Sequence, residues 1–338
     1  MLRNIGDYHF LADPESGVTF RWGKTWDDDP TFSPVPELAD ISISNRCSKG
    51  CPFCYKDSTP DGNLMSLEEY CQVLDALQSY EYGTVFQIAI GGGEPLEHPD
   101  FMKIVEETIK RGIVLNFTTN GQRLTKDICS ALEGKVGAMA ISASSINDLK
   151  RIRPAIDSAV GLKVNIHYIL TRSSIEEATK IVNGTYNDLL RGINAIVFLT
   201  YKPAGRGSET HLLKFDAATQ AFVNAIRIPQ TSCKIGFDAC FVPMLIRGKA
   251  VRKEMVDTCE GGFFTVYIDE NMRVSPCSFS GDRDSYSLKE YDFYDIWLNK
   301  LQPFRDRVKN ECKRDCHARE MCRGCCPYYP QITSCYQI

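Results

Sequence analysis

The sequence predicts an α/β protein, a partial TIM-like (β/α)6 barrel followed by a cysteine-rich region. Two observations predict the barrel: strand patterns alternate with helical patterns from Ala39 onward, and most of these strands carry polar residues on one face. A third observation separates the barrel from the carboxyl-terminal part of the chain, since none of the fifteen cysteines lies between residues 130 and 232. The predicted divisions are a lead-in over 1–38, the barrel over 39–232 and the cysteine-rich region over 233–338.

The composition is that of a soluble globular protein. Hydrophobic residues make up 43% of the chain and charged residues 24%, and a net charge of −4 argues against nucleic acid as the main partner. No apolar run approaches the roughly 18 residues of a membrane span, and the first ten residues lack a signal-peptide pattern. The sequence therefore predicts a cytoplasmic protein, and fifteen cysteines in that reducing compartment indicate metal or redox chemistry rather than disulfides.

Residues 1–38 are predicted to form a hairpin and an extended lead-in to the barrel. Clusters of Gly, Pro and Asp surround the strand-like segment 18–22. The lead-in is too short for a separate peptide-binding domain.

Six strand–helix units make up the predicted barrel. Two of the helices begin with capping boxes, Ser66 with Glu69 and Ser174 with Glu177, and a third ends at Gly112. The alternation implies right-handed βαβ connections and a parallel sheet. The predicted strands lie near residues 40–44, 84–91, 113–119, 138–143, 162–170 and 195–201.

One face of these strands is polar, although a parallel strand covered by helices on both sides should be apolar on both faces. Because side chains alternate along a strand, the polar residues of different strands fall on the same side. We therefore expect a polar lumen that binds a ligand at the carboxyl ends of the strands; the alternative is that single polar residues satisfy one another in a core. The polar positions are Ser42, Ser44, Gln87, Asn116, Thr118, Ser142, Asn165 and His167.

A loop with three cysteines, Cys47, Cys51 and Cys54, follows the first strand. Three thiolates within eight residues suit one compact iron–sulfur cluster. Since the loop has no fourth cysteine, one iron would keep an open position, where a substrate or cofactor binds. A structural zinc ion is the alternative, but it needs a fourth ligand, and the nearest are Cys71 in a helical pattern and the isolated His98.

A glycine-rich turn, Gly91-Gly92-Gly93-Glu94-Pro95, follows the second strand. Glycines let the backbone approach a ligand closely, and the Glu94 carboxylate can accept hydrogen bonds from an ammonium group. On its own such a turn is more often only a turn. Its position after the second strand, following the cysteine loop, favours a ligand-binding role.

The Cys-x3-Cys-x2-Cys spacing, with an aromatic residue before Cys54, resembles the motif of radical S-adenosylmethionine (SAM) enzymes, and the turn 92–95 resembles their motif for the SAM amino group. In that family three thiolates hold a [4Fe–4S] cluster, and SAM chelates the fourth iron through its amino and carboxylate groups. One electron then cleaves SAM to methionine and a 5′-deoxyadenosyl radical, which abstracts a hydrogen atom from the substrate. The resemblance implies that Cys47, Cys51 and Cys54 are the catalytic cluster ligands and that Gly92, Gly93, Glu94 and Pro95 bind SAM.

The resemblance also implies SAM contacts at later strand ends. Ser142 ends the fourth strand, where the family often places ribose or carboxylate contacts, and Asn165 faces the lumen from the fifth strand. The segment from Pro203 through Gly205 to Arg206 resembles a turn that lies by the adenine in many relatives. These assignments add Ser142, Asn165, Pro203 and Gly205 to the predicted cofactor site.

The cysteine-rich region resembles the SPASM extension of radical SAM enzymes, which holds two auxiliary [4Fe–4S] clusters. Its carboxyl-terminal spacing is Cys312-x3-Cys316-x5-Cys322-x2-Cys325-Cys326. The chain departs from the family pattern in the three-residue gap after Cys312, in Met272 where the family has Gly, and in the doubled Cys325-Cys326.

By motif position, the resemblance implies that one auxiliary cluster is held by Cys259, Cys277 and Cys326. Cys240 or Cys233 would be its fourth ligand, or that iron would stay open for substrate. Cys325 could replace Cys326. A pair of zinc sites is the alternative, since four-cysteine sets also suit zinc. The other cluster would be held by Cys312, Cys316, Cys322 and Cys335.

Relatives with this extension mostly modify peptides or proteins, so the resemblance implies a radical SAM oxidoreductase that matures a ribosomally made peptide by cross-linking, oxidation, epimerisation or backbone excision. The expected partners are the precursor peptide, a flavodoxin or ferredoxin electron donor and, because only 38 residues precede the barrel, a separate leader-binding protein. One alternative is a radical SAM dehydrogenase or epimerase acting on a small molecule. Another is a non-catalytic iron–sulfur carrier or scaffold, which would have no use for the turn 92–95 or a polar lumen.

Overall fold

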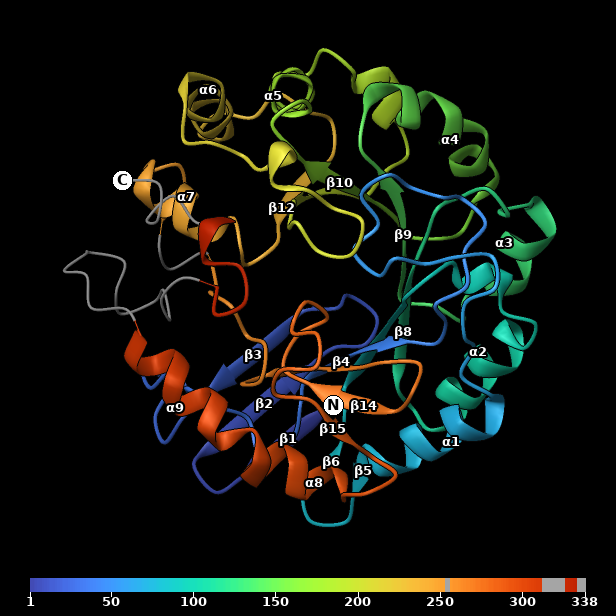
Figure 1. Cartoon of the computed structure of the whole chain (residues 1–338), viewed down its shortest axis with the longest axis vertical. Helices are drawn as coiled ribbons and strands as arrows, with labels where there is room; N and C mark the ends of the chain where they lie inside the picture. The colour runs from blue at the N-terminus through green and yellow to red at the C-terminus, as the bar shows by residue number, and fades with distance from the viewer. Residues whose placement is uncertain (253–255, 312–325, 333–338) are drawn as a thin grey trace.

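A curved, mainly parallel sheet organises the protein (Figure 1). The structure, a computed structural model, describes residues 1–252, 256–311 and 326–332. Within them the sheet has ten strands in the order β12-β11-β10-β9-β8-β7-β4-β13-β14-β15, parallel from β12 through β13 and antiparallel in β14 and β15. The strands are β4 (Leu38–Ser42), β7 (Gln87–Gly91), β8 (Val114–Thr119), β9 (Ala138–Ala143), β10 (Val164–Leu170), β11 (Ala195–Thr200), β12 (Lys234–Phe237), β13 (Thr265–Ile268), β14 (Arg273–Ser275) and β15 (Tyr286–Ser287).

The predicted α/β class is confirmed, and all six predicted barrel strands are present as β4 and β7–β11. Two further parallel strands flank these six, β12 beside β11 and β13 beside β4. These strands lie in the predicted cysteine-rich region, and they occupy the two ends of the run of parallel strands. The short β12 contains Gly236, which weakens a strand signal, and this explains why the pattern alone did not predict it.

Six helices cover the convex side of the sheet, following one another around its rim (Figure 1). The predicted capping box at Ser66 and Glu69 is present in full, and the helix near 100–111 ends before Gly112 at a φ of +70°. The helices are α1 (Leu67–Ala76), α2 (Phe101–Lys110), α3 (Lys126–Leu132), α4 (Ile146–Ser158), α5 (Ile175–Val182) and α6 (Ala217–Ile226).

The predicted capping box at Ser174 and Glu177 is wrong. Ser174 already has helical backbone angles, and its hydroxyl donates to the Ile169 carbonyl at 2.9 Å instead of capping α5. Glu177 instead accepts from the Ile146 N–H at 3.0 Å, at the start of the neighbouring helix α4. The tertiary contact wins because a carboxylate at a helix N-terminus satisfies an otherwise unpaired amide.

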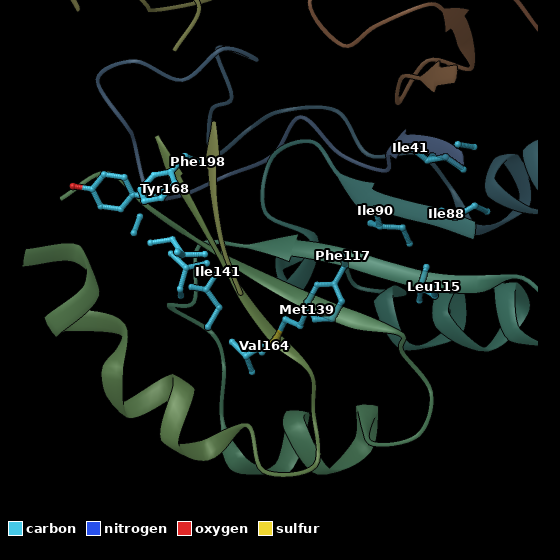
Figure 2. Close-up of a cluster of buried hydrophobic side chains, with 14 of the residues drawn as sticks. Ile41, Ile88, Ile90, Leu115, Phe117, Met139, Ile141, Val164, Tyr168 and Phe198 are labelled. Atoms are coloured by element: carbon cyan, nitrogen blue, oxygen red, sulfur yellow. The ribbon is translucent and has the colours of Figure 1, made fainter. Parts of the chain in front are cut away.

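Strand residues that point away from the lumen pack against these helices and form the main core (Figure 2). Each is at most 2% exposed, and burying such a side chain stabilises the fold by about 1.5–3 kcal/mol. Alternate residues face the opposite way, which leaves the concave side of the sheet to the polar positions. The core residues shown are Ile41, Ile88, Ile90, Leu115, Phe117, Met139, Ile141, Val164, Tyr168 and Phe198.

The lead-in forms a separate three-stranded antiparallel sheet, one strand more than the predicted hairpin. Its strands are β1 (Leu2–Ile5), β2 (Tyr8–Ala12) and β3 (Thr19–Trp22). The following segment runs beside the cysteine-rich region, since Ser33 and Glu37 donate backbone hydrogen bonds to Phe263 and Phe264.

The remaining elements are short or lie towards the carboxyl end. They are the hairpin β5 (Gln78–Ser79) and β6 (Gly83–Thr84), the helical turns η1 (Pro95–Glu97), η2 (Asn187–Leu190), η3 (Glu209–His211) and η6 (Pro330–Ile332), and the helices α7 (Val242–Arg247), α8 (Phe293–Asp295), η5 (Ile296–Lys300) and α9 (Gln302–Glu311). None of the described helices combines the length and apolar composition that crossing a bilayer requires.

Candidate active site

A cavity of about 470 Å³ lies on the concave side of the sheet, within the size range of ligand pockets. Six neighbouring parallel strands each contribute an inward-facing residue to it: Asp40, Ala89, Thr118, Ser142, His167 and Leu199. The loops that follow the strands add Cys47, Cys51 and Cys54 from the cysteine loop, Gly92 and Gly93 from the glycine-rich turn, and Asn120. The structure thus brings the cysteine loop, the glycine-rich turn and the strand interior to one space.

Two amide pairs lie nearer the amino ends of the strands, before the cavity-lining positions. Asn116 donates to Gln87 at 3.1 Å, and Asn194 donates to Asn165 at 2.7 Å. Asn165, a predicted SAM contact, is therefore engaged with another amide and is not part of the cavity lining. His167, two residues further along β10, does line it.

The glycine-rich turn is fastened to the cysteine loop through backbone atoms. Gly93 N–H donates to the Ser44 carbonyl at 2.6 Å, and Glu94 N–H donates to the Arg46 carbonyl at 2.8 Å. Gly92 has a φ of +110°, and a Cβ there would overlap both the Ser42 hydroxyl and the Ser44 carbonyl. Only glycine suits this position, because both the backbone angle and the packing exclude a side chain.

The Glu94 carboxylate braces the end of β8. It accepts hydrogen bonds from the Thr119 hydroxyl at 2.6 Å, the Asn120 N–H at 2.7 Å and the Leu96 N–H at 3.2 Å. Burial raises the pKa of Glu94. The Asn120 side chain, oriented in this way, lines the cavity and donates to the Cys47 sulfur at 3.9 Å. Glu94 and Pro95 lie behind the lining, with exposures below 9%.

Arg206 holds the cysteine loop from the side of the turn that follows β11. Its side chain donates to the carbonyls of Cys51 at 3.0 Å and Ser58 at 2.9 Å, and its backbone N–H donates to the Cys54 carbonyl at 3.0 Å. Gly205 has a φ of +56°, and a Cβ there would overlap the Cys54 carbonyl. Pro203 and Gly205 thus belong to a turn that supports the loop, and neither lines the cavity.

The donor set of the loop fits an iron–sulfur cluster. Cys47, Cys51 and Cys54 are free, half-buried and open to one cavity, and Ser58 N–H donates to the Cys54 sulfur at 3.5 Å. Burial raises the pKa of Cys47 and of Cys51.

A second group of cysteines forms beyond the cavity. Burial raises the pKa of Cys277 to about 12, with a further contribution from the thiols of Cys259 and Cys326, and the thiols of Cys259 and Cys326 act on Cys240 in the same way. Tyr329 N–H donates to the Cys326 sulfur at 3.4 Å. These four thiols come from four segments of the chain, and they are the ligands predicted for the first auxiliary site.

Cys233 lies apart from this group. It packs against the main core, and its thiol is 3.7 Å from the Thr231 hydroxyl. The other predicted ligands, Cys312, Cys316, Cys322 and Cys335, and the spare Cys325 lie outside the described residues.

Two charged pairs beside the cavity were missed by the sequence analysis. Lys202 and Asp238 line the cavity and form an ion pair at 3.0 Å. Although burial lowers the pKa of Lys202, the Asp238 carboxylate and the Cys240 thiol raise it, and the net effect is upward. Lys56 pairs with Glu270 at 2.7 Å and joins the end of the cysteine loop to the β13–β14 turn. Asp238 follows β12, the strand that the sequence analysis did not identify.

Asp40 is a further residue that the sequence analysis missed. It shares its face of β4 with Ser42, so the alternation that selected Ser42 could have found it. Burial raises the pKa of Asp40 to about 6, and nearby Lys56 offsets this in part. Ser42 and Ser44 are themselves fully buried outside the lining, and the Ser42 hydroxyl donates to Glu270 at 2.7 Å.

Comparison with known proteins gives a family match and distant relatives. Residues 41–196 match the radical SAM superfamily. The chain is 21% identical over 332 residues to mycofactocin maturase MftC of Mycobacterium tuberculosis (strain CDC 1551 / Oshkosh), covering 87% of this chain and 82% of that protein. It is 24% identical over 330 residues to an AdoMet-dependent heme synthase of Methanosarcina barkeri (strain Fusaro / DSM 804), covering 86% of this chain and 91% of that protein.

Solved structures share the fold. The crystal structure of Streptococcus suis SuiB bound to the precursor peptide SuiA superposes with a TM-score of 0.68 at 17% sequence identity, over 87% of this chain and 72% of that chain.

Proposed function

Because residues 41–196 are a domain of the radical SAM superfamily, we propose that this chain is a radical SAM enzyme that modifies a ribosomally synthesised peptide. The observation that carries the proposal is the shared cavity of about 470 Å³, to which Cys47, Cys51 and Cys54, the backbone of Gly92–Gly93 and the polar strand residues are all open. The maturase relative and the fold shared with a peptide-bound enzyme support a peptide substrate.

Some residues of the cavity would contact the cofactor and others the substrate. When bound at the three thiols, a [4Fe–4S] cluster with SAM on its open iron would supply the electron that cleaves SAM and so provides the hydrogen-abstracting radical. Gly92 and Gly93 leave room for the backbone to approach SAM, and Asn120 and Ser142 offer polar contacts beside it. Asp40 and His167 line the cavity from the strand interior, where the substrate group would enter.

The proposal includes a SPASM-like auxiliary region. The thiols of Cys240, Cys259, Cys277 and Cys326 support one auxiliary [4Fe–4S] cluster, with Cys240 as the fourth ligand. A second cluster at Cys312, Cys316, Cys322 and Cys335 is assigned by motif position. A flavodoxin or ferredoxin would deliver electrons, and a separate leader-binding protein would present the precursor peptide.

A small-molecule substrate is the second candidate. It is supported by the AdoMet-dependent heme synthase, which matches the chain over most of both lengths. The same cavity would then hold the whole substrate rather than one segment of a peptide.

The first test is SAM cleavage by the anaerobically reconstituted protein with a chemical reductant. The parent should release methionine and 5′-deoxyadenosine, and the Cys47→Ala/Cys51→Ala/Cys54→Ala variant should release neither. Cys71→Ala, on the outer helix α1, is the matched control and should behave as the parent does. Absence of both products from a parent loaded with iron would favour the carrier or scaffold alternative.

The second test separates the two substrate classes. Peptides encoded beside the gene and candidate metabolites are incubated with the active protein, and mass spectrometry follows each of them. A mass change confined to a peptide supports maturation, and one confined to a metabolite contradicts it.

A further inference from the structure

The second cysteine group is separated from the cavity by a thin wall of side chains. Asp238 and Phe279 line the cavity, and each lies two residues from a cysteine of the group, Cys240 or Cys277. Lys202 lines the same side. Any charge fixed in this wall acts on both the cavity and the cysteine group.

Lys202 is a buried cation held in a fixed position within this wall. It is 7% exposed, pairs with Asp238 at 3.0 Å and donates to the Thr200 carbonyl at 3.1 Å. Its ammonium also lies 4.5 Å from the centroid of the Phe279 ring. A lysine this buried is rare, and it remains charged only because these partners replace water.

The pair is placed unequally with respect to the cysteines. The Lys202 ammonium pairs with Asp238, two residues before Cys240, and also faces the Phe279 ring, two residues after Cys277, whereas Asp238 lies beside Cys240 in the chain. A cation that favours negative charge on a thiol also favours negative charge on a cluster that replaces the thiol protons. Reduction adds one electron to such a cluster, and nearby charge is one of the factors that set its potential.

We propose that Lys202 raises the reduction potential of the iron–sulfur cluster held by Cys240, Cys259, Cys277 and Cys326, and that Asp238 opposes it while fixing its position. This inference rests on the auxiliary cluster of the proposed function. Lys202 acts through charge and touches no reacting atom, so it is a positioning and tuning residue. A cluster made easier to reduce in this way is better suited to accept an electron than to donate one.

Lys56 provides a matched control. It too is a buried lysine paired with a carboxylate, Glu270, and near an aromatic ring, with its ammonium 5.7 Å from the Tyr267 centroid. It lies at the end of the cysteine loop and, unlike Lys202, does not line the cavity. Removing its charge should leave the auxiliary cluster unchanged.

The test is a redox titration of the full-length reconstituted protein, followed by electron paramagnetic resonance. Alanine at Cys47, Cys51 and Cys54 removes the first cluster, and the relevant signal is the one that Cys277→Ala abolishes. Lys202→Met should shift its midpoint to more negative values by at least a tenfold change in the reduction equilibrium, about 59 mV for one electron. Asp238→Asn should shift it to more positive values, and Lys202→Arg and Lys56→Met should leave it in place.

Midpoint shifts of opposite sign in Lys202→Met and Asp238→Asn establish the inference. An unchanged midpoint in an iron-replete Lys202→Met protein, or shifts of the same sign in both variants, would overturn it. If Lys202→Met fails to retain iron, Asp238→Asn provides the test. A midpoint shifted to more positive values supports the inference, and an unchanged or more negative midpoint overturns it. If Cys277→Ala abolishes no signal, the inference is also overturned, but the proposed function stands, since SAM cleavage at the first loop is measured separately.

Discussion

Asp40 and His167 project into the cavity from β4 and β10, and burial favours the neutral form of both. Burial raises the pKa of Asp40 to about 6 from an ordinary 3.8, and it lowers that of His167 to about 4 from 6.5. Near neutral pH His167 is therefore uncharged, and it can exchange hydrogen bonds in the cavity but not supply a positive charge.

The Asp40 shift predicts a pH-dependent stability. Between pH 3.8 and about pH 6 the folded protein keeps a proton that the unfolded chain has released, so stability is lost as the pH rises through this window. Asp40→Asn should be more stable than the parent above the window, by at most about 3 kcal/mol, and equal to it below. Denaturant unfolding at a series of pH values measures this, and a difference that does not vary with pH would contradict it.

His167 predicts the opposite slope. Between about pH 4 and pH 6.5 the unfolded chain holds a proton that the folded protein does not, so stability rises with pH across this range. His167→Asn should remove this rise, gaining stability over the parent only at acidic pH. The same unfolding series serves both variants. The stability difference from the parent should grow with rising pH for Asp40→Asn and with falling pH for His167→Asn.

Gly92 carries the tightest constraint in the glycine-rich turn. Gly92→Ala introduces a Cβ into the Ser42 hydroxyl and the Ser44 carbonyl at an unfavourable φ, and it should cost about 2–4 kcal/mol. Gly112→Ala is the control, because its φ is +70° but nothing lies within 4 Å of its added Cβ, and it should cost about 1 kcal/mol. Equal losses in denaturant unfolding would show that backbone angle alone, not packing, requires Gly92.

Residue types and spacing predicted the cysteine loop and the glycine-rich turn, but not which side chains of the turn meet the cavity. Glu94 is drawn to the amides at the end of β8, a contact between strands that no local pattern encodes. Asn165 lies on the predicted face but pairs with Asn194 instead of lining the cavity. How far a strand residue lies from the cavity depends on how neighbouring strands are staggered, which local sequence does not show.

Among the elements, the turn after β11 has the clearest role, because it holds the cysteine loop. Arg206 donates to two loop carbonyls and pairs with Asp57 at 2.8 Å. Its planar fork suits these several acceptors, whereas a lysine offers one point charge. Arg206→Lys should therefore loosen the loop and lower the iron retained by Cys47, Cys51 and Cys54 after gel filtration.

Arg153 on α4 is a matched control for this prediction. It also donates to two carbonyls, those of Leu189 and Arg191, and pairs with Asp157, but it lies away from the cavity. Arg153→Lys should cost similar stability without loss of iron. Equal iron loss in both variants would mean that the effect reflects general stability.

The elements themselves were predicted where periodicity was strong. The six barrel strands and the box at Ser66 were found because alternation and capping are local signals. The box at Ser174 failed because Glu177 is taken by the neighbouring helix α4, and β12 was missed because four residues with a glycine carry little pattern. The first error comes from a partner distant in sequence, and the second from a weak local signal.

At the scale of the whole molecule, the carboxyl-terminal region completes the sheet. β12 pairs with β11, and β13 pairs with β4, so strands from beyond residue 232 cover both edges of the six predicted strands. A chain ending at residue 232 should expose two apolar parallel edges and aggregate. Solubility and circular dichroism of this truncation measure the effect, and a soluble, cooperatively folding fragment would show that the six strands suffice.

Aromatic side chains beside the cavity connect the cysteine loop to the second group of cysteines. Tyr55, next to Cys54, contacts Phe279 in a tilted arrangement with ring centroids 4.8 Å apart, and Phe279 contacts Tyr329, three residues past Cys326, edge-on at 6.3 Å. Metal bound at one site would therefore steady the rings that shape the other. Because such coupling is reciprocal, filling either set of thiols would favour filling the other.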